Sequence, residues 1–497
     1  MSVHAALKPP ETGHPRRTAI LALMSACTVL TIALVAAINL ALPSLAADAL
    51  RPSSSRLLWI VDAYVIVFAC LLIPAGAFGD RFGRKGTLTT GLAVFALGCL
   101  LCAVAPSIPL LITGRALSGA GAALVMPATL SIVVHVFPAE RRGQAIATWT
   151  AATGAAGVLG NIGGGLVLEY FSWRGLFWAA APTALVMLLL VAGLAPKAGR
   201  HDSPLDLVGS GLLITAFLGL LYGIIEGPGR GWTSGTVLGG FAVAAVMLAV
   251  YTAYALRARH PVVDPRYFRD PPLRAGAFGV TVTFLGLFGL FFVNAQFLQY
   301  VKGYSPVVTG VAIGPMAVAM IVVSRRGAGL AERFGPARVI VAGMLTIAAG
   351  LGLLSLVDVS TPYVLYAGYL VVMAIGLGLC LPALSTAIIA AVPPERAGLG
   401  SGLNSATREV GSALGVAIVG TIMTSRFTTA LPAPLRDHAS SVAATLTAAG
   451  PGDRDEVVDA VAGAMAAGYR VTAVVLACGA VIVGWWLRRR GGARKSP

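Results

Sequence analysis

The segment that decides the fold is GAFGDRFGRKG, residues 76–86. It places four charged residues, Asp80, Arg81, Arg84 and Lys85, within six positions. The apolar stretches on either side carry almost no charge over about twenty residues, which is the length of a helix that crosses a bilayer. Mixed charges between two such stretches indicate a short loop at the membrane surface, and the glycines of the segment permit a tight turn.

Composition also indicates a membrane protein. Of the 497 residues, 57% are hydrophobic and 11% are charged, whereas soluble domains carry about 25% charged residues. The net charge of +16 does not indicate nucleic-acid binding, because the basic residues lie in short loops rather than on one soluble face. The six cysteines fall inside apolar stretches and are expected to be small buried residues. The sequence has no Walker A, HExxH or Ser-His-Asp pattern and no metal-ligand cluster, so we expect neither ATP-driven transport nor an enzyme.

Hydropathy predicts an all-α polytopic membrane protein with fourteen transmembrane helices. Helices are expected because lipid cannot satisfy open backbone groups. The two termini and every second connection carry 25 Lys and Arg residues, and the alternate connections carry 9. The positive-inside rule therefore places both termini in the cytoplasm. The predicted spans are residues 18–42, 57–77, 87–105, 109–132, 144–168, 174–195, 206–226, 234–256, 274–298, 307–325, 337–357, 362–384, 402–425 and 467–487.

The opening loop has a counterpart about half a chain later. The sequence DRFG (80–83) matches ERFG (332–335), and both follow the second span of a six-span block when the seventh and eighth spans are set aside. Such internal repeats are typical of secondary transporters. The predicted organisation is an N-terminal six-helix bundle (1–195), two extra transmembrane helices with polar linkers (196–273) and a C-terminal six-helix bundle (274–497) with an external loop (426–466).

These residues resemble the major facilitator superfamily, and more closely its fourteen-span drug:proton antiporters. The loop motif G-x-L-a-D-r-x-G-r-k matches residues 76–85, with Phe78 where Leu is usual. The fourth-span motif l-x-x-x-R-x-x-q-G-x-g matches residues 111–121 around Arg115, with Ser118 in the place of Gln. The resemblance covers nearly the whole chain. It implies the major facilitator fold, in which two six-helix bundles surround a central cavity, here with two additional central helices.

The fifth-span antiporter motif, g-x-x-x-G-P-x-x-G-G, is matched less well. Gly160, Gly164 and Gly165 are present, but Asn161 replaces the proline. In the resembled family this motif is associated with export. Without its proline, the motif implies close helix packing more firmly than it implies the direction of transport.

The first span departs from the resembled family at the position of its acid. The pattern l-D-x-T-x-x-N-x-A-L-P keeps its last four specified residues at 39–43, but Leu34 replaces the acid and Ala36 replaces Thr. In exporters of lipophilic cations that acid is a candidate cation or proton site. Its absence weakens the expectation that this chain exports such cations.

The resemblance implies that the opening loop is a conformational lock, which braces the cytoplasmic side of the outward-open state. We expect its acid to pair with a neighbouring arginine or to face a helix N-terminus. The second copy has Pro336 and Ala337 in place of two of the bases, so the N-terminal copy should carry most of the charge. The predicted lock residues are Gly76, Asp80, Arg81, Gly83, Arg84 and Lys85.

Two charges lie at similar depth inside predicted spans. Asp62 and Arg115 are each about five or six residues from the external end, and charges at bilayer depth are costly and usually functional. We predict a protonation-sensitive ion pair. The alternative is that Asp62 lies in the headgroup zone and only caps its helix. Arg408 and Glu409, at the cytoplasmic start of the thirteenth span, are either a neutralised interfacial pair or gate partners of the lock.

The ninth span provides candidate substrate contacts, because three phenylalanines follow one helical stripe and amide side chains lie near them. The alternative for this stripe is lipid contact or core packing. Glu226, near the external face, is either interfacial or an attractor for cations. The predicted cavity residues are Tyr64, Phe284, Phe288, Phe291, Asn294, Gln296 and Glu226.

The sequence therefore predicts a proton-coupled secondary transporter that exports amphipathic drugs, antibiotics or related small molecules across the cytoplasmic membrane by alternating access. The expected partners are the lipid bilayer, a small amphipathic substrate and protons, with no cofactor and with a monomer sufficient. One alternative is a specific metabolite or lipid transporter of the same fold. The other is a non-transporting membrane receptor or scaffold, against which the charged loop and Arg115 argue.

Overall fold

The computed structural model is helical throughout its regular elements. It describes residues 14–493 apart from 42–43, 46–49, 51–53, 197–205, 394–396, 433–434, 436–441, 443–444, 447–449 and 451–452. The helices of the described residues are α1 (Arg17–Leu40), α3 (Ser54–Phe82), α4 (Arg84–Ala103), α5 (Ile108–Val136), α6 (Ala139–Tyr170), α7 (Arg174–Leu194), α8 (Leu207–Arg230), α9 (Gly235–Ala255), η1 (Pro265–Arg269), α10 (Pro271–Gln296), η2 (Phe297–Val301), α11 (Pro306–Ala312), α12 (Gly314–Phe334), α13 (Pro336–Leu354), α14 (Tyr363–Ala390), α15 (Ala397–Ala430) and α18 (Arg454–Ala493).

Fourteen segments of the described chain are long and apolar enough to cross a membrane. Two of them join neighbouring elements, because α10 continues into the π-helical η2, and α11 is followed directly by α12. The predicted fold class and number of spans are confirmed. Most predicted span ends lie within a few residues of the helix ends.

The largest difference is at the last two spans. Helix α15 runs on to Ala430 and α18 already begins at Arg454, so both ends of the predicted external loop 426–466 are helical. The reason is a small apolar core at this end, in which Phe427 and Leu431 belong to the same buried cluster as Val457 and Val461. These side chains recur at helical spacing and bury one another beyond the apolar length of the span.

The chain forms two compact units. The first comprises Met1–Tyr222, Gly239–Ala277 and Leu384–Thr407, and the second comprises Gly223–Leu238, Phe278–Ala383 and Arg408–Pro497. Five helices, α8, α9, α10, α14 and α15, begin in one unit and end in the other. The predicted three-part division of the sequence at residues 195 and 273 stays a prediction.

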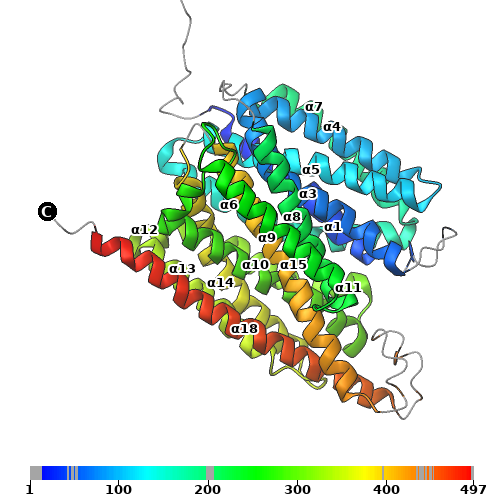
Figure 1. The fold of residues 1–497 in the computed structure, drawn as a ribbon. Coiled ribbons are helices and arrows are strands. Elements are labelled where there is room, and N and C mark those ends of the chain that lie inside the picture. Colours follow the sequence, from blue (N-terminus) through cyan, green and yellow to red (C-terminus); the bar gives the residue numbers. More distant parts are fainter. Residues whose placement is uncertain are drawn as a thin grey trace, which may run out of the picture. The chain divides into compact units, whose positions relative to one another are not determined.

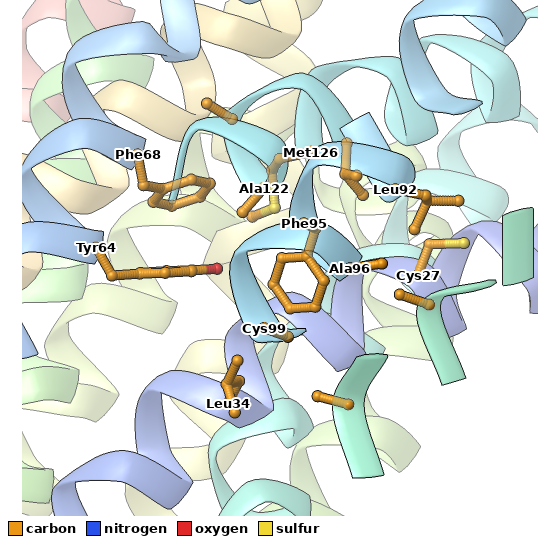
Figure 2. Close-up of a cluster of buried hydrophobic side chains, with 14 of the residues drawn as sticks. Cys27, Leu34, Tyr64, Phe68, Leu92, Phe95, Ala96, Cys99, Ala122 and Met126 are labelled. Atoms are coloured by element: carbon orange, nitrogen blue, oxygen red, sulfur yellow. The ribbon is translucent and has the colours of Figure 1, made fainter. Parts of the chain in front are cut away.

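The first unit has a continuous buried apolar core. Helices α4 and α5 pack along each other, and α4 also packs on α7 (Figure 1). Figure 2 shows buried side chains of this core, among them Cys27, Leu34, Tyr64 and Phe95. The position that the resembled family gives to an acid, Leu34, is therefore filled by an apolar side chain that is 5% exposed.

Small residues let α6 approach α1 closely. A Cβ added to Gly160 would collide with the backbone of Ala33, and one added to Gly164 would lie 2.6 Å from the Cβ of Ala37. Gly165 is buried, whereas Asn161, in the place of the motif's proline, is half-buried. The glycine face expected to pack closely thus faces another helix rather than lipid.

The second unit uses the same device. Gly411 and Gly415 of α15 face the backbone of Thr281 and Leu285 on α10 so closely that an added Cβ would collide with it. Helices α13 and α18 lie along each other (Figure 1). Close helix contacts through glycine are therefore present in both units.

The two copies of the loop motif have the same local geometry. Gly83 and Gly335 both have left-handed backbone conformations, with φ of 98° and 85°, which glycine adopts at little steric cost. The arginine two residues before each glycine lies over the adjacent phenylalanine ring. Its Cζ is 5.5 Å from the ring centroid in the first copy and 5.2 Å in the second. The sequence repeat is thus also a repeat of the backbone turn.

The α1–α6 contact gives a stability prediction. We expect Gly160→Ala to lower the thermal unfolding temperature in detergent, because overpacking costs about 1–3 kcal/mol. The matched control is Gly163→Ala on the same helix, where an added Cβ meets nothing within 4 Å. That control should melt at or above the wild-type temperature, because alanine favours helix by about 1 kcal/mol over glycine. A Gly160→Ala protein as stable as its control would contradict the close approach.

Candidate functional site

The lock acid, Asp80, lies near the end of α3 and is 6% exposed. Its Oδ1 is 3.6 Å from Arg84 Nε, and its Oδ2 accepts a hydrogen bond of 3.3 Å from the backbone N–H of Leu399. Leu399 is in the first turn of α15, where backbone N–H groups have no partner within the helix. The carboxylate therefore has both partners that the sequence suggested, an arginine and a helix N-terminus.

Arg84 connects this acid to a third helix. Its Nη1 donates to the backbone carbonyl of Ser131 on α5 at 3.4 Å. Asp80, Arg84 and Ser131 pack around one point, together with Gly76. The first residue of α4 thus joins the ends of α3 and α5, and through the acid the start of α15.

The other predicted lock residues lie around this centre. Gly83 makes the left-handed turn between α3 and α4. Arg81 is half-buried and lies over Phe82, and Lys85 Nζ donates to the carbonyl of Ala192 on α7 at 2.7 Å. These residues fix the loop, whereas the contact with α15 is made by the acid.

The second copy of the motif differs in charge, as expected. Glu332 is exposed, and so are Arg333 and Phe334. Pro336 begins the next helix, α13. A carboxylate in water needs no helix terminus to stabilise it, so the repeat conserves the turn without the buried acid.

Arg115 is fully buried on α5. Its Nε donates to the carbonyl of Ile60 at 2.9 Å, Nη2 lies 3.5 Å from the carbonyl of Val61, and its guanidinium lies 4.5 Å from the ring centroid of Tyr64. All three partners are on α3. Asp62 is on the same helix turn, but its side chain lies outside the described residues, so the predicted ion pair stays a prediction.

A chain of neutral hydrogen bonds leads from Tyr64 into the first span. Its hydroxyl donates to the carbonyl of Thr31 at 2.9 Å, and the Thr31 hydroxyl donates to the carbonyl of Thr28 at 2.9 Å. Thr28 Oγ1 shares a hydrogen bond of 3.1 Å with Thr129 Oγ1 and accepts one of 3.2 Å from Trp149 Nε1. This network links four helices without any acid, and the sequence analysis missed it. The available signal was a pair of threonines three residues apart in an apolar span.

The three phenylalanines of α10 form one continuous face. Phe284 and Phe288 stack with ring centroids 6.1 Å apart, and Phe288 meets Phe291 edge-on at 5.7 Å. Arg408 of α15 lies over Phe284, with its Cζ 4.5 Å from the ring centroid. At Phe284 the aromatic stripe therefore contacts a buried cation instead of lipid.

The remaining cavity candidates have local partners. Asn294 is buried and accepts a hydrogen bond from the hydroxyl of Tyr366, a partner that the sequence analysis missed. Gln296 donates to the carbonyl of Phe292 on its own helix at 3.4 Å. Glu226 pairs with Arg230 one turn later on α8. Tyr64, as described above, contacts Arg115.

The predicted gate residues differ in their surroundings. Arg408 is 4% exposed and rests on the aromatic face of α10, whereas Glu409 is half-buried. Both lie in the second unit, while the start of α15 that contacts the lock acid lies in the first. Their role as gate partners stays a prediction.

Comparison with known proteins decides the family. A model of the Major Facilitator Superfamily matches residues 24–416, which is most of the chain. The chain belongs to the major facilitator superfamily. The resemblance stated from the sequence motifs is confirmed.

Similar members of the superfamily are drug-efflux proteins. The multidrug efflux pump LfrA of Mycolicibacterium smegmatis is 32% identical over 97% of this chain and 98% of its own length. The multidrug resistance protein Stp of Mycobacterium tuberculosis is 33% identical over 78% of this chain and 72% of its length. The solved structure of a bacterial homologue of the lysosomal transporter Spinster has the same fold, with a TM-score of 0.64 at 18% identity over 97% of this chain and 99% of that one.

This superfamily member is a multi-pass protein of the cell membrane and a transporter rather than an enzyme, as predicted. Its fourteen spans and its match to transporters along almost its whole length agree on this point. The expected ligands of such a protein are small molecules. The buried charged side chains of the described residues are Asp80, Arg84, Arg115 and Arg408, and each lies at a contact between helices.

The setting of Arg115 gives a prediction. We expect Arg115→Lys to lower the unfolding temperature in detergent, because lysine cannot reach two carbonyls as a planar fork and hydrogen bonds of charged groups contribute about 1.5–3 kcal/mol. The control is Arg333→Lys, since that arginine also lies over an aromatic ring, Phe334, but is exposed. Equal small effects of the two substitutions would show that the contacts with α3 contribute little.

Proposed function

We propose that this protein exports amphipathic drugs, antibiotics or related small molecules from the cytoplasm in exchange for protons. The observation that carries the proposal is the match to a multidrug efflux pump over 97% of this chain. The internal repeat and its repeated turn support transport by alternating access, in which two bundles rock around a central site.

The lock acts at the start of α15. In the described state the carboxylate of Asp80 stabilises the N-terminus of that helix and pairs with Arg84. Breaking the hydrogen bond to Leu399 releases the first turn of α15 from α3, which we take as the event that opens the cytoplasmic side. The buried setting of the acid supports this role, because a desolvated carboxylate holds its two partners more strongly than an exposed one.

Proton coupling is assigned to the pair of Asp62 and Arg115. Arg115 already binds the carbonyls of the two residues that precede Asp62. Protonation of the acid would remove its attraction for the guanidinium and change the packing of α3 on α5. Glu409, half-buried in α15, is the second acid to test, because it too lies within a membrane span.

The remaining features fit an exporter in the cytoplasmic membrane. We expect both termini in the cytoplasm, a monomer that suffices for transport, and the proton gradient as the energy source with no cofactor. The aromatic face of α10 and Gln296 would contact the apolar and polar parts of the substrate. Asn294 and Glu226 are weaker candidates, since each is already engaged by a neighbour.

A specific metabolite or lipid transporter is the second candidate function. Two departures favour it, namely Leu34 in place of the first-span acid and Asn161 in place of the motif's proline. Both functions require substrate movement across the membrane, so the same transport assay separates them by substrate range.

Proton-coupled export can be tested with purified full-length protein in vesicles. We expect tetraphenylphosphonium or chloramphenicol to drive proton flux through the wild type, and Asp62→Asn to abolish that flux because no proton can then be released at this site. Glu409→Gln serves as the comparison. Loss of flux in Glu409→Gln with normal flux in Asp62→Asn would move the coupling site to α15. Wild-type vesicles in which neither probe drives proton flux would overturn the proposed function.

The lock predicts an asymmetry between the two copies of the motif. Asp80→Asn should lower the export rate about tenfold, because it weakens a charge-assisted hydrogen bond worth about 1.5–3 kcal/mol. Glu332→Gln, in the exposed second copy, should leave the rate within about twofold. Membrane insertion, measured by the amount of folded protein, should be normal in both. Normal export by Asp80→Asn would rule the lock out.

A further inference from the structure

The start of α15 carries a buried polar face that the proposed function does not use. Ser401, Asn404 and Ser405 are each 0–1% exposed. Four of their side-chain atoms, the two hydroxyl oxygens and both the Oδ1 and Nδ2 of the amide, find no hydrogen-bond partner among the described residues.

The neighbours of this segment define which side of the helix is polar. A Cβ added to Gly402 would lie 2.8 Å from the carbonyl oxygen of Leu72 on α3, and one added to Gly400 would lie 3.5 Å from Ile389 on α14. At 100° per residue, the three polar side chains fall on the arc between these two contacts. The opposite arc is apolar, with buried Leu403 as an example.

Polar atoms in this setting require partners. Buried polar groups in proteins are hydrogen-bonded with few exceptions, and an amide without partners is costly to remove from water. Partners for these atoms can be water, a bound molecule, or groups that another state of the protein brings near. Ser401 lies two residues after Leu399, whose backbone N–H donates to Asp80. Breaking that hydrogen bond would release the first turn of α15 and uncover the polar face.

We propose that Ser401, Asn404 and Ser405 form a hydrogen-bonding site for the uncharged polar groups of the exported compound. The site rests on the proposed export function and becomes accessible when the contact between Asp80 and Leu399 breaks. An amide and two hydroxyls provide donors and acceptors but no negative charge. The ligands that fit are neutral amphipathic compounds with carbonyl, amide or hydroxyl groups, rather than lipophilic cations.

The chemistry of the first span agrees with this class of ligand. Its buried polar side chains are the hydroxyls of Ser25, Thr28 and Thr31, and Leu34 occupies the place of the acid. A cation that leaves water needs a compensating negative charge. The first span provides none, and the acid one turn beyond Ser405 on α15, Glu409, lies beside the buried cation Arg408, which already offsets its charge. A neutral compound needs only hydrogen bonds and apolar contact.

The test compares two probes on purified full-length protein. Chloramphenicol is uncharged and carries amide and hydroxyl groups, whereas tetraphenylphosphonium is a cation without hydrogen-bonding groups. We expect Asn404→Leu to weaken chloramphenicol binding about tenfold, with tetraphenylphosphonium binding unchanged. The double variant Ser401→Ala/Ser405→Ala should act in the same direction, which covers the case in which the leucine variant does not fold. The control Thr407→Val, on the same helix, should bind both probes as the wild type does.

Thermal unfolding without ligand provides a second readout. Removing unpartnered polar atoms should leave the unfolding temperature unchanged or raised, whereas loss of a structural contact would lower it. A lowered temperature, equal losses for both probes, or unchanged chloramphenicol affinity in both variants would overturn the proposal, and the last result would mean that the face holds water only.

The outcomes also separate this proposal from the export function. One outcome would overturn the polar site and leave proton-coupled export standing. In it, the wild type moves tetraphenylphosphonium into vesicles in exchange for protons but does not bind chloramphenicol. Vesicles that move neither probe would overturn both.

Discussion

The arrangement of the first unit depends on one buried carboxylate at one helix N-terminus. Removing Asp80 from water is costly, and its two partners, the guanidinium of Arg84 and the N–H of Leu399, offset that cost together. Neither partner alone neutralises both oxygens. The contact joins the first turn of α15 to the end of α3; in the proposed mechanism, the burial of the polar face that follows depends on it.

Arg115, a further buried charge of this unit, is stabilised differently. The guanidinium of Arg115 donates to two carbonyl oxygens of α3 and lies over the ring of Tyr64. Around it, threonines, a tyrosine and a tryptophan continue the hydrogen bonding through the first span. The described part of this bundle is thus polar without being acidic at its centre, which distinguishes it from the first-span pattern of the resembled family.

Much of this architecture is predicted from the sequence because the strongest signals, apolar length and an internal repeat, extend over whole spans. Apolar length determines the spans, and the match between DRFG and ERFG predicted a repeat whose glycines do share a left-handed turn. The extension of α18 escaped prediction because alanine and glycine mark its buried side only weakly. The polar face of α15 escaped for a related reason. Serine and asparagine in a small-residue helix give no hydropathy signal, and only burial shows that Asn404 lacks partners.

Helix α15 contains 34 residues, so at 1.5 Å per residue it is a rod of about 50 Å. Leu399, at its tethered end, and Gly411, where it lies against α10, are separated by about 18 Å along that rod. Glycine offers no protruding side chain at the second point, so the backbones of the two helices meet there closely. In the proposed mechanism, the hydrogen bond at the end of this rod holds the helix in the described position. Its release would move α15 as one rigid piece, and the contact of Arg408 over Phe284 on α10 would have to change with it.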